Sequence, residues 1–74
     1  MENINLAIGG RIKQLRHSHC MTQEELARQI GISKDLLAKI ESGRQKISVE
    51  GLHKICLLFG YTLRKFFDIP SLDI

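Results

Sequence analysis

Residues 22–44, TQEELARQIGISKDLLAKIESGR, constrain the fold most, because they predict two short helices joined by a glycine turn. Thr22 and Glu25 have the spacing of a capping box, in which each side chain satisfies a free backbone N–H group of the other residue at a helix start. Gly31 falls where the chain leaves the first helix with a positive φ, and Ser33 is a favoured N-cap for the second helix. The stretch therefore predicts two helices, over about 23–30 and 33–42.

Two helices joined by a tight turn cross each other and pack together. In this stretch, small and apolar residues occupy the positions that face the crossing. The apolar positions share the inward face or plug the turn: Leu26, Ile30, Ile32, Leu37 and Ile40. Ala27 is small at the point where we expect these helices to approach closely, and Gly43 supplies the second helix stop. This pattern is typical of a helix-turn-helix, whose second helix fits the major groove of DNA.

The rest of the chain also predicts helices. Apolar residues recur at helical spacing within 5–19, although Gly9 and Gly10 each weaken that helix by about 1 kcal/mol relative to alanine. Ser48 is a plausible N-cap for a helix that ends at Gly60, and Thr62 is one for a short helix that Pro70 stops. Strand-like alternation is absent, so we expect an all-α, five-helix, single domain over residues 1–74.

Composition restricts the kind of protein. The 74 residues carry 11 basic and 8 acidic side chains, a formal net charge of +3, which suits a polyanionic partner. No apolar run approaches ~20 residues and no leader opens the chain, so we expect a cytoplasmic protein without a membrane span. Cys20 and Cys56 form no CxxC pair, and we expect a buried Cys56 thiol and no disulfide.

One local cluster raises the question of a metal. His17, His19 and Cys20 lie together, but zinc takes three or four ligands, normally from two separated pairs, and no second pair is visible. We therefore interpret the cluster as a solvated loop and expect neither metal nor cofactor. Nucleophile–base pairs and glycine-rich phosphate cradles are also absent, so we do not expect an enzyme.

Five motifs follow one another along the chain: Gly10–Arg16, Thr22–Ala27, Gly31–Ser33, Ile40–Gly43 and Ile47–Ser48. In order and spacing they resemble the Cro/C1-type, lambda-repressor-like (XRE) helix-turn-helix regulators, over roughly residues 8–68. The resemblance implies a compact five-helix domain that binds a pseudo-palindromic operator as a dimer and controls transcription, for example as a phage-type repressor. More weakly, Arg44–Ser48 and His53–Cys56 also resemble restriction–modification controller proteins.

The start and outer face of the second motif helix are the candidate base-reading surface, carried by Ser33, Lys34, Asp35 and Lys39. The two lysines are suited to donate to guanine O6 and N7. Asp35 either accepts from cytosine N4 or only stabilises the helix N-terminus. Leu36 either contacts a thymine methyl or packs against the domain surface.

The turn after this helix is the candidate phosphate-binding segment, with Ser42, Arg44 and Lys46. For Arg44 and Lys46 an ordinary charged loop is the alternative. Three further basic residues are weaker candidates for the rim of the interface that faces the DNA backbone, and a solvated surface explains them equally well: Arg11, Lys13 and Arg28.

The family resemblance implies roles for three more residues. Gln23 would contact a phosphate and brace the second motif helix, or else lie on a solvated helix start. Arg16 and Glu41 would form a structural ion pair that holds the first helix onto the motif, and such a partly buried pair is costly to break.

The C-terminal segment, about 61–74, is the candidate dimer interface. Its apolar side chains exceed what a short helix needs for inward packing: Tyr61, Phe66, Phe67, Ile69, Leu72 and Ile74. The alternative is that they only close the core. We expect no small-molecule ligand. A second functional class, an antitoxin or adaptor that uses this fold mainly to hold a protein, would show more apolar residues on the outer face of 33–46 than Leu36 alone.

Overall fold

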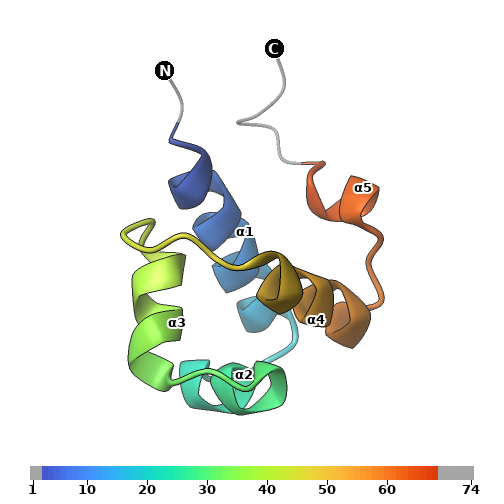
Figure 1. The fold of residues 1–74 in the computed structure, drawn as a ribbon. Helices are drawn as coiled ribbons and strands as arrows, with labels where there is room; N and C mark the ends of the chain where they lie inside the picture. The colour runs from blue at the N-terminus through green and yellow to red at the C-terminus, as the bar shows by residue number, and fades with distance from the viewer. Residues whose placement is uncertain (1–2, 69–74) are drawn as a thin grey trace.

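Five α-helices make up residues 3–68, the part of the chain that this computed structural model describes (Figure 1). In chain order they are α1 (Ile4–Ser18), α2 (Gln23–Ile30), α3 (Lys34–Glu41), α4 (Val49–Phe59) and α5 (Leu63–Phe66). This confirms the predicted all-α, five-helix fold. No helix within residues 3–68 is both long enough and apolar enough to span a bilayer.

Side-chain caps begin every one of these helices. The N-caps are Asn3, Thr22, Ser33, Ser48 and Thr62, each in an extended conformation with its side chain accepting a backbone N–H bond. Thr22 and Glu25 form the predicted capping box, and Gly31 ends α2 with a φ of 75°. Because the caps satisfy backbone groups through residues only two or three positions away, they set the helix starts locally.

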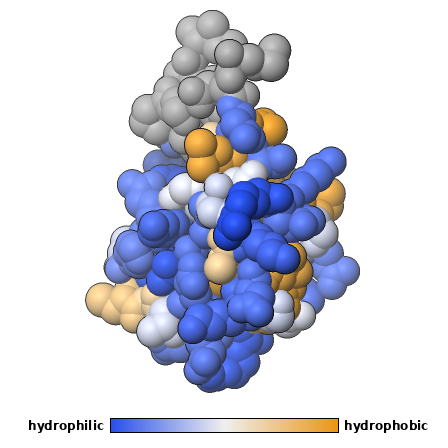
Figure 2. All heavy atoms as spheres, turned by 90° about the vertical axis from the view of Figure 1, so that its left-hand side faces the viewer, coloured by the Kyte–Doolittle hydropathy of each residue, from blue (hydrophilic) through white to orange (hydrophobic). Residues whose placement is uncertain are grey.

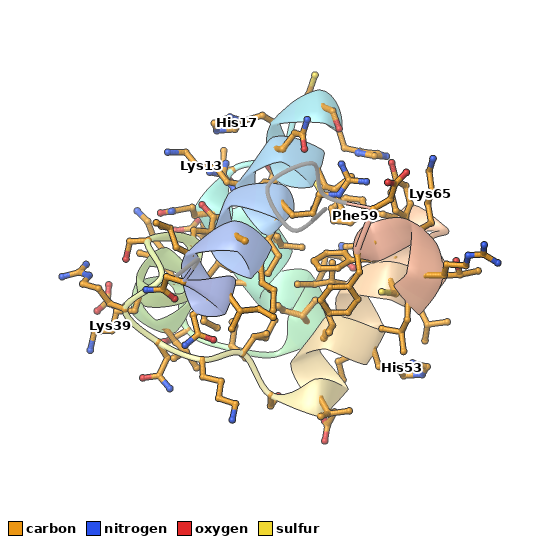
Figure 3. All side chains as sticks on the ribbon, turned by 90° about the horizontal axis from the view of Figure 1, so that it is seen from above. Lys13, His17, Lys39, His53, Phe59 and Lys65 are labelled. Carbon is orange, nitrogen blue, oxygen red and sulfur yellow. The ribbon has the colours of Figure 1, made fainter. Side chains whose placement is uncertain are left out.

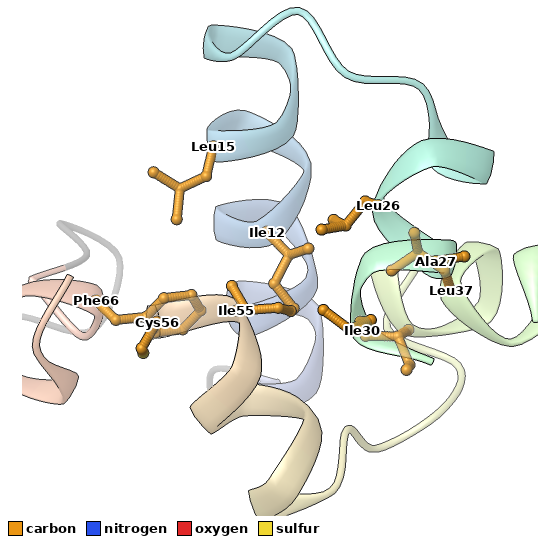
Figure 4. Close-up of a cluster of buried hydrophobic side chains, with 10 residues drawn as sticks. Ile12, Leu15, Leu26, Ala27, Ile30, Leu37, Ile55, Cys56 and Phe66 are labelled. Carbon is orange, nitrogen blue, oxygen red and sulfur yellow. The ribbon is translucent and has the colours of Figure 1, made fainter. Parts of the chain in front are cut away.

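The hydrophobic core draws on all five helices. Its ten buried residues are Ile12, Leu15, Leu26, Ala27, Ile30, Leu37, Ile40, Ile55, Cys56 and Phe66. Ile12 of α1 lies between the buried residues of α2 and Ile55 of α4 (Figure 4). Burial raises the pKa of the Cys56 thiol. The predicted packing face of the helix-turn-helix therefore lies against α1 and α4.

Phe66 corrects one sequence prediction. We expected it in a dimer interface, but its exposed fraction is 0% and it packs in the core beside Cys56 (Figure 4). With no accessible surface it belongs to the interior of one chain. A helix of four residues has too few positions for periodicity to separate its inward from its outward face.

At Gly9 the backbones of α1 and α3 approach each other closely. The helix continues through both glycines, and a Cβ atom at Gly9 would collide with the carbonyl oxygen of Ile40 and lie 2.9 Å from that of Glu41. A Cβ atom at Gly10 would meet nothing within 4 Å. The sequence analysis treated both glycines only as weak helix formers and missed this approach, which holds α3 against α1.

Candidate nucleic-acid interface

Helix α3 lies at one edge of the molecule, and α5 lies on the opposite side (Figure 1). It buries Leu37, Ile40 and Glu41 and leaves its other face to solvent. Seen from this side, the surface is mostly hydrophilic, with apolar atoms in separate patches (Figure 2). The helix thus presents a polar outer face to a partner.

The candidate base-reading residues lie where the sequence placed them on α3. Lys34, Asp35 and Lys39 are exposed, and Lys39 projects away from the body of the domain (Figure 3). The Ser33 hydroxyl accepts the backbone N–H of Leu36 at 3.0 Å. Leu36 is partly buried and packs against the core, which is the second of the two alternatives considered for it.

The turn that follows α3 folds back onto the end of the helix. The carbonyl oxygen of Lys39 accepts the backbone N–H groups of Arg44 at 3.0 Å and Gln45 at 3.2 Å. The Arg44 Nε donates to the Ser42 Oγ at 3.0 Å. Arg44 and Lys46 are exposed. Their charges lie just after the C-terminal end of α3, and Lys34 lies at the start of the same helix.

A buried polar network ties α3 to α1 and α2. Arg16 donates through Nε to Glu41 Oε2 at 2.8 Å and through Nη2 to Glu41 Oε1 at 3.0 Å. Arg16 Nη1 also donates to the Met21 carbonyl at 2.8 Å, and the side-chain amide of Gln23 donates to Glu41 Oε1 at 3.0 Å. The side chains of the ion pair are only 8% and 3% exposed. The network orients α3 relative to the other two helices.

Of the three weaker candidates for the rim of the DNA interface, Arg11 and Arg28 make contacts within the domain. Arg11 lies 5.4 Å from the ring centroid of Tyr61 and donates to the carbonyl of Lys65 at 3.4 Å. Arg11 therefore connects α1 to the α5 region, and α5 lies on the side of the molecule opposite α3 (Figure 1). Arg28 lies 3.6 Å from Glu24 in an exposed pair.

The residues of the His17, His19 and Cys20 cluster are exposed, and His19 makes a packing contact of its own. The His19 ring centroid lies 4.6 Å from that of Phe59, and its Nδ1 is 2.9 Å from the Leu15 carbonyl oxygen. No grouping of three possible metal ligands occurs within residues 3–68. The sequence analysis, which expected a solvated loop, missed this contact because Phe59 is forty residues away.

The candidate dimer segment is only partly described. Tyr61 and Phe67 are half-buried against the core, while Ile69, Leu72 and Ile74 lie outside the described residues. Other apolar side chains at the end of α4 and in α5 are more exposed, and the sequence analysis did not select them: Leu57 at 68%, Leu58 at 40% and Leu63 at 54%.

Comparisons with known proteins concern most of the chain. A helix-turn-helix family model matches residues 12–66. The antitoxin PezA of Streptococcus pneumoniae serotype 4 is 44% identical over 66 residues, which are 89% of this chain and 40% of that protein. An uncharacterized transcriptional regulator in the ATPase CF(0) region of Rhodospirillum rubrum is 33% identical over 92% of this chain and 63% of its own length. The chain thus spans less than two thirds of either relative.

One solved structure bears on the controller resemblance. The restriction-modification controller protein C.AhdI from Aeromonas hydrophila superposes with a TM-score of 0.80, over 89% of this chain and 100% of that chain. Its sequence identity is 23%, so the likeness concerns the fold.

Proposed function

This chain belongs to the Cro/C1-type helix-turn-helix family, and from that premise we propose that it regulates transcription by binding a specific DNA operator as a homodimer. The observation that carries the proposal is a set of four exposed cations on α3 and its following turn: Lys34, Lys39, Arg44 and Lys46. None of them takes part in the ion pairs found among residues 3–68. Cations without internal partners are suited to a polyanion.

The two ends of α3 support two tasks. The N-terminal residues of a recognition helix face base edges, and Lys34 occupies that position. Lys39 lies one turn after Asp35, in the last turn of α3, where it is exposed and projects away from the domain (Figure 3), so it is suited to bases as well. Arg44 and Lys46 follow the helix and are suited to bind backbone phosphates. The side-chain amide of Gln23 donates one of its two hydrogens to Glu41, and the second hydrogen is free to donate to a phosphate at the start of α2.

A two-fold operator needs a surface between two copies. We assign it to the end of α4 and to α5 with its neighbours Tyr61 and Phe67, where Leu57 and Leu63 are exposed and Tyr61 and Phe67 are half-buried. This surface lies away from α3, so two copies can contact each other there while each α3 remains free for DNA. The half-sites would then lie about 34–36 Å apart.

Binding-site selection from random duplexes, followed by a salt series on the recovered sequence, tests the proposal. We expect a symmetric site and a steep fall of affinity with salt, with a slope of about −4 if a dimer neutralises at least four phosphates. An affinity that barely changes with salt would contradict phosphate binding by Arg44 and Lys46.

Two variants separate base reading from backbone binding. Lys39→Ala should change the preference among operator sequences, by about 1–3 kcal/mol at one base pair. Arg44→Ala should weaken binding to all sequences similarly and reduce the magnitude of the salt slope by about 1 for each half-site, or about 2 for the whole operator. Equal and uniform losses from both variants would show that α3 does not present Lys39 to the bases.

Similarity to PezA favours a second candidate, an antitoxin that holds a protein partner. The outer face of α3 and its turn carries mostly charged and polar side chains, and Leu36 and Ala38 are its partly buried apolar residues, so we place this function second. If selection enriches no sequence and the salt series is flat, the antitoxin function becomes the better account.

A further inference from the structure

Ser42 lies at the centre of a hydrogen-bond relay at the end of α3. Its Oγ donates to the carbonyl oxygen of Lys39 at 3.0 Å and accepts from the Nε of Arg44 at 3.0 Å. The same carbonyl accepts two backbone N–H groups of the turn. The relay therefore joins the helix end, the serine and the arginine side chain.

The chemistry of Ser42 and Arg44 determines which hydrogen-bond donors each can still offer to a DNA phosphate. A serine hydroxyl carries one hydrogen, and a fully ionised phosphate oxygen only accepts hydrogen bonds. Ser42 has already given its hydrogen to Lys39, so it has none to give to a phosphate while this bond holds. Arg44 uses only its Nε, and the four N–H groups on its two Nη atoms remain.

We propose that Ser42 is a positioning residue: it holds Arg44 by the Nε so that the pair of Nη atoms faces a DNA phosphate, and it does not itself contact the DNA. The proposal rests on the proposed DNA-binding function and replaces the direct phosphate contact that the sequence suggested for Ser42.

The backbone around Arg44 is already fixed, which leaves its side chain as the variable part. Gly43 has a φ of 79°, and a Cβ atom there would lie 2.8 Å from the Leu6 Cα, so the turn is packed against α1. An exposed arginine otherwise loses much rotamer freedom when it binds. A bond from Nε to Ser42 restricts that freedom before DNA arrives.

A double-mutant cycle tests the relay, with the wild type, Ser42→Ala, Arg44→Ala and the double variant titrated against the selected duplex by fluorescence anisotropy. Ser42→Ala alone should weaken binding roughly two- to tenfold, the effect of releasing one long side chain. In the Arg44→Ala background the same change should alter affinity by less than about twofold, because Ser42 then has nothing to position. Ser42→Thr keeps the hydroxyl and should restore affinity to within about twofold of the wild type.

Thermal unfolding of the same proteins serves as the control, since the lost bond to Lys39 should lower stability equally in both backgrounds. An equal loss of affinity from Ser42→Ala in both backgrounds, or a Ser42→Thr variant that binds like Ser42→Ala, would overturn the positioning role. If the wild type binds no duplex at all, the proposed function fails; if it binds but the cycle is additive, only the relay fails.

Discussion

Gly9 and Gly10 are adjacent in α1 and face different surroundings. Gly9 is buried against the backbone of α3, whereas Gly10 is exposed. Gly9→Ala should destabilise the domain by about 1–3 kcal/mol, because the added methyl group has to push the Ile40 carbonyl away. Gly10→Ala should stabilise it by about 0.5–1 kcal/mol through helix propensity. Urea unfolding of both variants measures the difference, and equal effects would mean that α1 and α3 are not in close contact at Gly9.

Glu41 and Glu24 both pair with an arginine, one pair in the interior and the other on the surface. Glu41→Gln should lower the free energy of unfolding by about 3–5 kcal/mol, because the buried Arg16 charge loses its counterion. Glu24→Gln should change it by less than about 1 kcal/mol, because its pair with Arg28 is exposed. Chemical denaturation decides between these outcomes, and a similarly small effect of both variants would mean that the network does not hold α3.

At the scale of the element, the capping box sets the start of α2. Glu25 accepts the backbone N–H of Thr22 at 3.0 Å, and the backbone N–H of Glu25 donates to Thr22 Oγ1 at 3.1 Å. Hydrogen bonds to the Glu25 carboxyl, first from the backbone N–H of Thr22 and then from the Thr22 hydroxyl, stabilise its ionised form and hold the pKa of Glu25 below its ordinary value. The box stabilises the first turn of the helix that carries Gln23.

The lowered pKa of Glu25 predicts a pH dependence. Its contribution to stability should be complete above the ordinary carboxyl range, near pH 4, and should be lost as the pH falls through the lowered value. Unfolding measured between about pH 6 and 2 should therefore depend less on pH in Glu25→Gln than in the wild type. Glu24→Gln is the matched control, and a wild-type pH dependence in Glu25→Gln would argue against the box.

Element ends were the most predictable part of the fold. The predicted N-caps Thr22, Ser33, Ser48 and Thr62 all begin helices, because a cap depends on residues two or three positions away. The inward face of the four-residue α5 was wrongly assigned at Phe66, because so short a helix has no usable period.

At the scale of the whole molecule, the exposed apolar surface of α4 and α5 governs assembly in our proposal. Leu63→Lys should shift the protein from dimer to monomer in sedimentation equilibrium, because an ammonium group does not tolerate burial between two copies. Val49→Lys is the control, since Val49 is 86% exposed at the far end of α4 and should leave the dimer unchanged. A wild-type monomer at concentrations well above those that saturate the operator would refute the dimer.

The sequence by itself determined the helices, four of their five N-caps and the helix-turn-helix, because these depend on neighbours within a few residues and on one apolar period. It also placed the exposed cations of α3, since surface position follows from the buried face. Only the tertiary structure decided that Gly9 touches α3, that Arg11 holds α5, that Phe66 is buried and that the hydrogen of Ser42 belongs to Lys39. The first three features depend on contacts between segments far apart in the chain, and the last depends on the path of the turn after α3. Neither kind of contact produces a periodic pattern in the sequence.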